Sequence, residues 1–268
     1  MRRSRPFLEV FACAVKEDHR FPILEVFALV FTFGVFAILD LEAYAWNGEV
    51  FAYRLVSSLW GFPLSIIFVI LILKNIAYGL GSDLDKGVIQ TLFSYPLTRR
   101  SILRAKLLSA VGVVLLLVVG IQVFALLLLV PDVITAHSSV VFLTYAANLC
   151  SPALLLAGLV LLLTLLLKRG GLPLVFGVVS CLAFAIISPL VTSIASATGS
   201  DLAMRIWAVI DPNLALQSYY LGTAGLPYAA RTWVPSFAEV ILHLVAGFLI
   251  VAVIFIVAYR YFERRLGI

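Results

Sequence analysis

Two stretches of the chain contain no ionisable side chain and are almost wholly apolar. They read VGVVLLLVVGIQVFALLLLV over residues 111–130 and LLLAGLVLLLTLLL over residues 154–167. About 20 apolar residues in a helix cross the hydrocarbon core of a bilayer. Of the 268 residues, 63% are hydrophobic and only 12% are charged, whereas a soluble domain has about a quarter charged. These features predict a polytopic membrane protein and exclude a water-soluble domain.

The apolar runs predict six transmembrane helices in a single all-α transmembrane domain over residues 1–268. We place the spans at Phe21–Leu39, Leu55–Leu80, Ala105–Val130, Val140–Leu167, Leu172–Ala197 and Phe237–Tyr259. Six spans with short connections fit this length, and twelve do not, which excludes a full-length two-lobed carrier in one chain.

The distribution of Lys and Arg predicts the orientation of these spans. An even number of spans places both termini on one side of the membrane. All but three of the 19 Lys and Arg residues fall on that side, the exceptions being Arg54, Arg205 and Arg231. Because cytoplasmic loops carry the excess of Lys and Arg, we expect a protein integral to the cell membrane with both termini in the cytoplasm.

Two segments outside the spans are predicted to lie in the membrane interfaces. Residues 1–20 predict an amphipathic helix at the cytoplasmic interface, with Phe7, Phe11 and Val15 at helical spacing. The apolar stretch there is too short and too charged for a cleaved signal peptide, and a plain extension of the first span is the alternative. Residues 198–236 mix aromatic and apolar side chains, which favours short helices in the outer interface.

The cytoplasmic segment 81–104, between the second and third spans, predicts a separate amphipathic helix. Gly79 and Gly81 allow the second span to bend or end, and Ser82 followed by Asp85 resembles a capping box. The helix is expected to run from about Asp83 to Tyr95, before Pro96. Its apolar stripe is formed by Leu84, Val88, Thr91, Leu92 and Tyr95.

The next helix is predicted to begin after Thr98, whose hydroxyl can cap it. Its first turns are basic and contain Arg99, Arg100, Arg104 and Lys106. Such side chains hold phospholipid headgroups or acidic residues of a partner protein. An ordinary polar loop with snorkelling Arg side chains is the alternative.

The order of residues in this segment resembles the ABC-2 type transporter permeases, the transmembrane subunits of ABC exporters. The shared pattern is an acid, a Gly, two apolar positions, a residue before Pro, an Arg, Ile-Leu and a Lys. It is carried here by Asp83 or Asp85, Gly87, Leu92 and Phe93, Tyr95-Pro96, Arg99, Ile102-Leu103 and Lys106. The family often has Glu and then Gly-Thr where this chain has Asp and Gly87-Val88. The length, the six spans and the long segment before the last span are also similar.

The resemblance implies a permease subunit that pairs with a second, identical or related permease and is driven by a separate ABC ATP-binding subunit. The segment would contain the coupling helix, a rigid rod that passes the motion of the ATPase to the spans. The residues expected to form or position this contact are Asp83, Asp85, Lys86, Gly87, Ile89, Gln90, Thr91, Phe93, Ser94, Tyr95, Pro96, Arg99 and Arg100.

The sequence contains no motif for chemistry of its own. It has no GxxxxGK[ST] phosphate loop, no HExxH and no GxSxG, and its three Cys and three His are far apart. We therefore expect no enzyme activity, no metal and no cofactor in this chain, with ATP and magnesium bound by the partner subunit. The scattered basic residues do not predict a nucleic-acid partner.

Few polar residues lie within the predicted spans, and three of them are predicted to line a pathway: Gln122, Asn148 and His243. Hydrogen bonding between helices is the alternative for each. With almost no charge in the spans, a lipid-like or amphiphilic substrate is favoured over a highly charged solute. A non-transporting membrane scaffold and an ion-coupled carrier remain as alternative functions.

Overall fold

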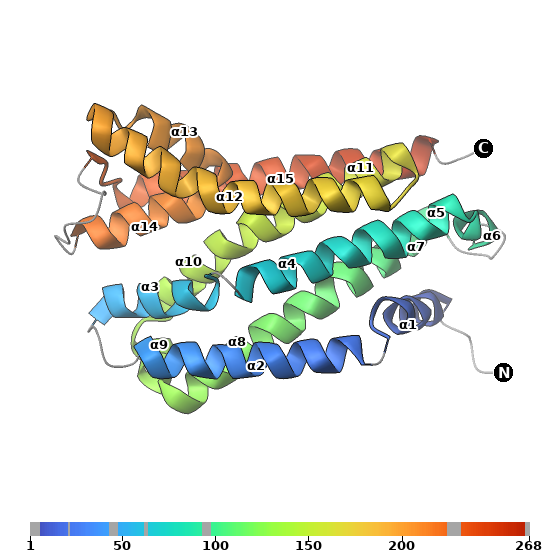
Figure 1. The fold of residues 1–268 in the computed structure, drawn as a ribbon, viewed down its shortest axis with the longest axis horizontal. Helices are drawn as coiled ribbons and strands as arrows, with labels where there is room; N and C mark the ends of the chain where they lie inside the picture. The colour runs from blue at the N-terminus through green and yellow to red at the C-terminus, as the bar shows by residue number, and fades with distance from the viewer. Residues whose placement is uncertain are drawn as a thin grey trace.

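The computed structural model describes residues 6–20, 22–42, 48–61, 64–92, 98–223 and 232–265, which form helices and short connections with no strand among them (Figure 1). The α-helices in the first half are α1 (Pro6–Asp18), α2 (Ile23–Glu42), α3 (Gly48–Leu59), α4 (Leu64–Lys74), α5 (Gly81–Asp85), α6 (Val88–Leu92), α7 (Arg99–Leu107) and α8 (Val114–Leu129). Those in the second half are α9 (Pro131–Ala136), α10 (Ser138–Asn148), α11 (Leu155–Leu167), α12 (Gly171–Thr198), α13 (Leu202–Ile210), α14 (Pro212–Thr223) and α15 (Phe237–Arg265). Three π-helical segments, η1 (Asn75–Leu80), η2 (Leu108–Val113) and η3 (Leu149–Leu154), lie inside long helices.

Five helices among the described residues are long and apolar enough to cross a membrane, and α1 with α2, a pair bent by 70°, brings the number to six if it counts as one span. The five are Leu64–Asp85, Arg99–Leu129, Ser138–Leu167, Gly171–Thr198 and Phe237–Arg264. The all-helical class and the membrane-protein composition are thus confirmed. The sidedness of the termini stays a prediction.

The predicted second span is wrong at its start. The sequence predicts Leu55–Leu80, but residues 48–59 form α3, and a new helix begins at Leu64. α3 ends in a tight turn, in which the N–H groups of Trp60 and Gly61 bond to carbonyls three residues earlier. No charged residue lies between Arg54 and Lys74 to mark this break, although Gly61 and Pro63 are residue types typical of a turn.

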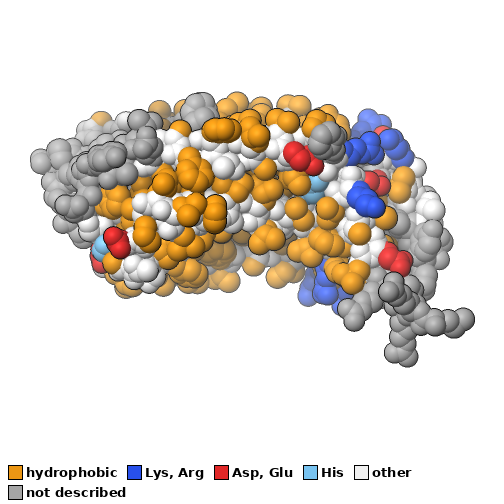
Figure 2. All heavy atoms as spheres, turned by 90° about the horizontal axis from the view of Figure 1, so that it is seen from below, with side chains coloured by type: hydrophobic (Ala, Val, Ile, Leu, Met, Phe, Trp, Pro, Cys, Tyr) orange, Lys and Arg blue, Asp and Glu red, His pale blue; other side chains and the backbone are white. Residues whose placement is uncertain are grey.

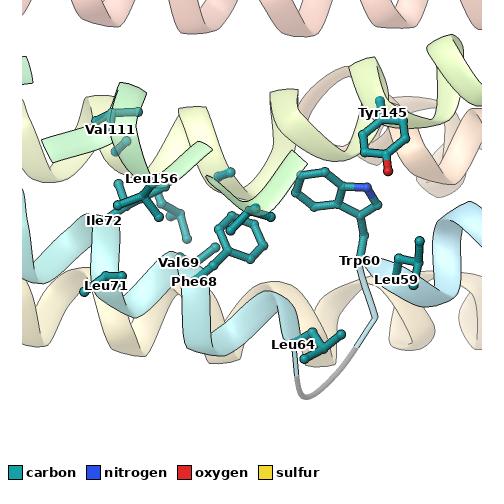
Figure 3. Close-up of a cluster of buried hydrophobic side chains, with 14 of the residues drawn as sticks. Leu59, Trp60, Leu64, Phe68, Val69, Leu71, Ile72, Val111, Tyr145 and Leu156 are labelled. Atoms are coloured by element: carbon teal, nitrogen blue, oxygen red, sulfur yellow. The ribbon is translucent and has the colours of Figure 1, made fainter. Parts of the chain in front are cut away.

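Trp60 fixes this turn to the core (Figure 3). Its ring meets Phe68 of α4 edge-on at 5.2 Å and Tyr145 of α10 edge-on at 5.6 Å between ring centroids. Aromatic pairs in this geometry stabilise by roughly 1 kcal/mol each beyond their burial. The turn is therefore a packed corner of the bundle.

The sides of the bundle are covered by exposed apolar side chains, which Figure 2 shows along the body of the molecule. Phe33, Leu116 and Phe142, on three different helices, are 69%, 78% and 71% exposed. In water such a surface would drive aggregation, whereas in a bilayer it meets acyl chains. The exposure thus agrees with the hydropathy of the spans.

Charged side chains gather at one end of the bundle, which we call the basic end (Figure 2). α1, α5, α6, the start of α7 and the end of α15 lie there (Figure 1). α3, α9, α13 and α14 lie at the other end, which we call the opposite end. The short helices predicted within residues 198–236 are present as α13 and α14, and residues 224–231 lie outside the described part.

Candidate functional site

The second span ends at the basic end in a sharp turn, which we call the elbow and define as residues 84–88. The N–H of Lys86 bonds to Ser82 O at 3.0 Å, and that of Gly87 bonds to Leu84 O at 3.4 Å. Gly87 has a φ of 71°, the left-handed conformation with which glycine commonly ends a helix. The single helix predicted from Asp83 to Tyr95 is therefore wrong, because α5 ends at Asp85 and α6 begins at Val88.

The glycines that suggested an earlier bend serve close packing instead. The helix continues through Gly79 and Gly81 without a break. A Cβ on Gly79 would lie 2.5 Å from Asp18 Oδ1 of α1, and one on Gly81 would lie 2.8 Å from Gly170 Cα. These glycines thus let α1 and the turn before α12 approach the second span.

The predicted contact residues around the elbow lie in different environments. Asp85, Lys86 and Thr91 are exposed, whereas Ile89 is 2% exposed and packs into the main core. Asp83 is turned toward the interior, with its side chain 13% exposed. The Gln90 side chain and the residues Phe93, Ser94, Tyr95 and Pro96 lie outside the described part of the chain.

The start of α7 is tied to the end of α15. The expected cap is present, since Thr98 Oγ1 accepts a hydrogen bond from Ser101 N–H. The Arg100 side chain donates to Glu263 Oε1 at 2.7 and 2.9 Å, and Arg99 donates to the main-chain oxygen of Glu263 at 3.2 Å. These two predicted residues join the third span to the last one.

Behind the elbow lies a group of buried and half-buried polar side chains, which we call the polar cluster. It comprises Glu17, Asp18, His19, Lys74, Asn75, Asp83, Lys106 and Ser109. Its centre is Lys106, whose Nζ lies 2.6 Å from Glu17 Oε2 and 2.7 Å from Asp83 Oδ2. One ammonium group is thus paired with two carboxylates from different helices.

The remaining members fasten α1 to the second and third spans. Ser109 Oγ donates to Asp18 Oδ2 at 2.5 Å, and His19 Nε2 lies 3.0 Å from Ser109 O. Lys74 Nζ donates to Asp18 O at 3.1 Å and to Asn75 Oδ1 at 2.9 Å. Asp18 and His19 are 4% and 8% exposed, so the end of α1 is buried in this cluster.

Two of the three π-helical segments meet at the polar cluster. η1 begins at Asn75 and η2 contains Ser109 and Ala110, whose carbonyls receive side-chain hydrogen bonds from His19 and Asn75. A π turn widens the helix and disturbs the regular bonding of its carbonyls, which can then accept from side chains. Such segments are frequent at functional sites.

A cavity of about 310 Å³ opens between α1, the second span and the elbow. Glu17, Asp18, Lys74, Asp83 and Lys86 are among its lining residues. Four of these five residues, all but Lys86, are already paired in the cluster. The cavity therefore gives water access to one side of the network that connects α1 to the elbow.

The chain matches no family model, and a search of curated proteins finds none similar in sequence. The resemblance to the ABC-2 permeases therefore rests on the sequence pattern alone.

The three predicted pathway residues do not form one site. Gln122 is fully buried and donates to Leu59 O at 3.1 Å, which ties the third span to α3. Asn148 donates to Thr144 O at 2.8 Å and lies 3.5 Å from Asn213 Oδ1. His243 Nδ1 lies 2.7 Å from a main-chain oxygen one turn earlier in α15. Each makes bonds within or between helices, at different places in the bundle.

A second polar group at the opposite end centres on Asp211, between α13 and α14. Ser188 Oγ of α12 donates to Asp211 Oδ2 at 2.8 Å and accepts from Trp207 Nε1 at 2.8 Å. Burial raises the pKa of the Asp211 carboxyl to about 6, although its bonds to Ser188 and the Asn213 backbone favour the charged form. This carboxyl therefore titrates close to neutral pH.

Most of the polar cluster was not predicted from the sequence. The sequence predicts residues 1–20 only as an interface helix, with Glu17 and Asp18 in a charged run, and Lys106 as one of several basic residues. The available signal was a run of ionisable residues directly before the first span, together with Lys106 at the start of the third. Only the approach of α1 to the second and third spans brings these groups together.

Proposed function

We propose that this protein is the transmembrane permease subunit of an ATP-driven ABC exporter, coupled to a separate ATP-binding subunit that docks at the elbow. The basic end then faces the cytoplasm, as the excess of Lys and Arg there favours. Two permease subunits, identical or related, would form the translocation unit with two ATPases, and lipids would surround it.

One observation carries this proposal: the ion pair between Asp83 and Lys106 lies directly behind the exposed residues Asp85 and Lys86. A partner that pushes on the exposed face would move α5, and the buried pair would transmit this displacement to the third span. Because Lys106 also binds Glu17, α1 would move with them. A loose polar loop would have no such connection to the spans.

The rigid rod expected for coupling is replaced in this proposal by a braced elbow. α5 continues the second span, so a force at residues 85–88 acts on that span without a hinge between them. Gly87 sets the direction in which the chain leaves. The apolar character of the spans favours a lipid-like or amphiphilic substrate, which can enter from the bilayer.

The test is purification of the protein in mild detergent from its native membranes, with identification of co-purifying chains and an ATPase assay. We expect an ATP-binding subunit to co-purify with the natural protein and to be lost with Asp85→Lys combined with Lys86→Glu. The matched control is Glu9→Lys combined with Lys16→Glu, which reverses two exposed charges on α1 and leaves the net charge unchanged.

Retention of the ATPase by the elbow variant would contradict the assignment of the elbow. Recovery of the natural protein without an ATPase would favour a scaffold or an ion-coupled carrier over the transporter. Loss of the ATPase from the control as well would mean that the charge changes act through general surface electrostatics.

A further inference from the structure

A groove of about 340 Å³ lies at the basic end between α7, α11 and α15, away from the polar cluster. Its floor contains Leu103 and Leu161, both fully buried, and one wall is formed by Phe255 and Tyr259 of α15. Arg100 and Arg260 line its outer part. The ion pair between Arg100 and Glu263 described above lies at this outer part.

The polarity of the groove changes along the axis of α15. Phe255 and Ile256 line it toward the middle of the span, and Arg260 and Glu263 line it at the basic end. Eight residues of helix separate Phe255 from Glu263, which corresponds to about 12 Å along the axis. An apolar inner part followed by a charged outer part matches the order of acyl chain and headgroup in one leaflet.

The charge around the outer part is positive. The Glu263 carboxylate already accepts from Arg100, and its main-chain oxygen accepts from the Arg99 side chain. The guanidinium group of Arg104 lies 5.8 Å from the centroid of the Tyr259 ring. Arg260 is exposed, and no ion pair to an acid is found for it among the described residues. One carboxylate among these guanidinium groups leaves an unbalanced charge that a phosphate diester can neutralise.

From this order of polarity and charge we infer that the groove binds one anionic phospholipid of the leaflet at the basic end. Its phosphate contacts Arg260 and Arg100, and one acyl chain lies against Phe255 and Leu161. The site is independent of the proposed function, since a scaffold or a carrier with this groove would bind the same lipid.

The test uses the purified full chain in detergent, without an ATPase, titrated with phosphatidylglycerol or phosphatidylcholine and followed by native mass spectrometry. We expect one phosphatidylglycerol to bind and phosphatidylcholine to bind at least about tenfold more weakly. Inorganic phosphate in excess should not displace the lipid, because it lacks the acyl chain that fills the apolar part.

Variants at Arg260 and Ile256, with a control at Arg264, distinguish binding in the groove from binding through general surface charge. Arg260→Gln should weaken phosphatidylglycerol binding by about tenfold, the effect of losing one charge-assisted contact. The matched control, Arg264→Gln, changes an exposed Arg one turn further along α15 that does not line the groove and should bind as the natural protein does. Ile256→Trp, at a position 54% exposed, fills the apolar part without disturbing the core and should also weaken binding.

Equal losses with Arg260→Gln and Arg264→Gln, or unchanged binding with Ile256→Trp, would overturn the inference. Equal binding of the two lipids would also overturn it, because the charge of the groove would then decide nothing. Displacement by inorganic phosphate would assign the arginines to a soluble anion instead. None of these results depends on whether an ATPase binds the elbow.

Discussion

The ammonium group of Lys106 lies 2.7 Å from the carboxylate of Asp83, which joins the start of the third span to the last turn of the second. Lys106 is 7% exposed and also contacts Glu17 at the end of α1. One cation thus holds three helices together at the end of the bundle where the chain turns out at the elbow.

Replacing Lys106 with Met should destabilise the protein by roughly 3 kcal/mol, because two carboxylates lose their common counter-charge and one of them is largely buried. We place the value at the lower end of the usual range because the Glu17 side chain is 51% exposed. Unfolding in increasing SDS, followed by Trp fluorescence, measures the loss. Lys16→Met, at an exposed position on α1, should unfold as the natural protein does, and an unchanged midpoint for Lys106→Met would remove the structural role of the ion pairs.

Replacing Gly79 with Ala should loosen α1 from the second span. The added Cβ would meet Asp18 Oδ1 at 2.5 Å, so the end of α1 must move, at a cost of about 1–3 kcal/mol. Hydrogen exchange of the α1 amides should rise. In Gly120→Ala, where nothing lies within 4 Å of the new methyl group, exchange in α1 should stay as it is, and equal behaviour of the two variants would refute the packing argument.

Gly87 and Gly199 provide a matched pair for separating backbone strain from function. Both have positive φ, 71° and 67°, at helix ends on opposite sides of the bundle. Alanine at either position should cost about 1 kcal/mol. Only Gly87→Ala should reduce ATPase co-purification, measured by quantitative mass spectrometry. The same reduction with Gly199→Ala would attribute the effect to stability.

The burial of Asp211 predicts a stability that falls as the pH rises. The pKa of this carboxyl is about 6 in the folded protein and 3.8 where it is not buried, as in the unfolded chain. Below pH 3.8 the carboxyl is therefore protonated in both states. Above pH 6 the folded state has lost about 3 kcal/mol relative to the unfolded one. Thermal unfolding between pH 4 and 8 in detergent should therefore show a smaller decline for Asp211→Asn than for the natural protein. Parallel curves would contradict the raised pKa.

The orientation of the bundle can be tested with a thiol reagent that does not cross membranes. In a Cys13→Ser background, Lys86→Cys should react only after the cells are opened, and Arg205→Cys should react in intact cells. The two positions are exposed at opposite ends of the bundle. The reverse pattern would show that the protein has the opposite orientation in the membrane, with the elbow outside the cell.

The sequence predicted the spans well where the apolar run ended at a charge or a turn residue. The predicted fourth and fifth spans agree with Ser138–Leu167 and Gly171–Thr198 within a few residues. It failed at the second span, because no charged residue between Arg54 and Lys74 marks the break, and the turn signals Gly61 and Pro63 were included in the span. Hydropathy indicates whether a segment is surrounded by water or by an apolar environment. A buried turn and a buried helix share the apolar environment, so hydropathy does not distinguish them.

At the candidate site, the features that the sequence predicts and those that only the tertiary structure shows are more clearly separated. The sequence by itself determined the helical class, the membrane-like surface and the concentration of Lys and Arg at one end, since these depend on composition and on local periodicity. It also marked Gly87 as part of the resemblance pattern, but it predicted a continuous helix through this residue, where the structure has a turn with a φ of 71°. Only the tertiary structure decided that Gly79 and Gly81 are contacts rather than bends, and that Lys106 pairs with Glu17 and Asp83. Those outcomes depend on groups as far apart in the chain as residues 17 and 106, and no local pattern records the free energy of a contact that exists only once the helices have packed.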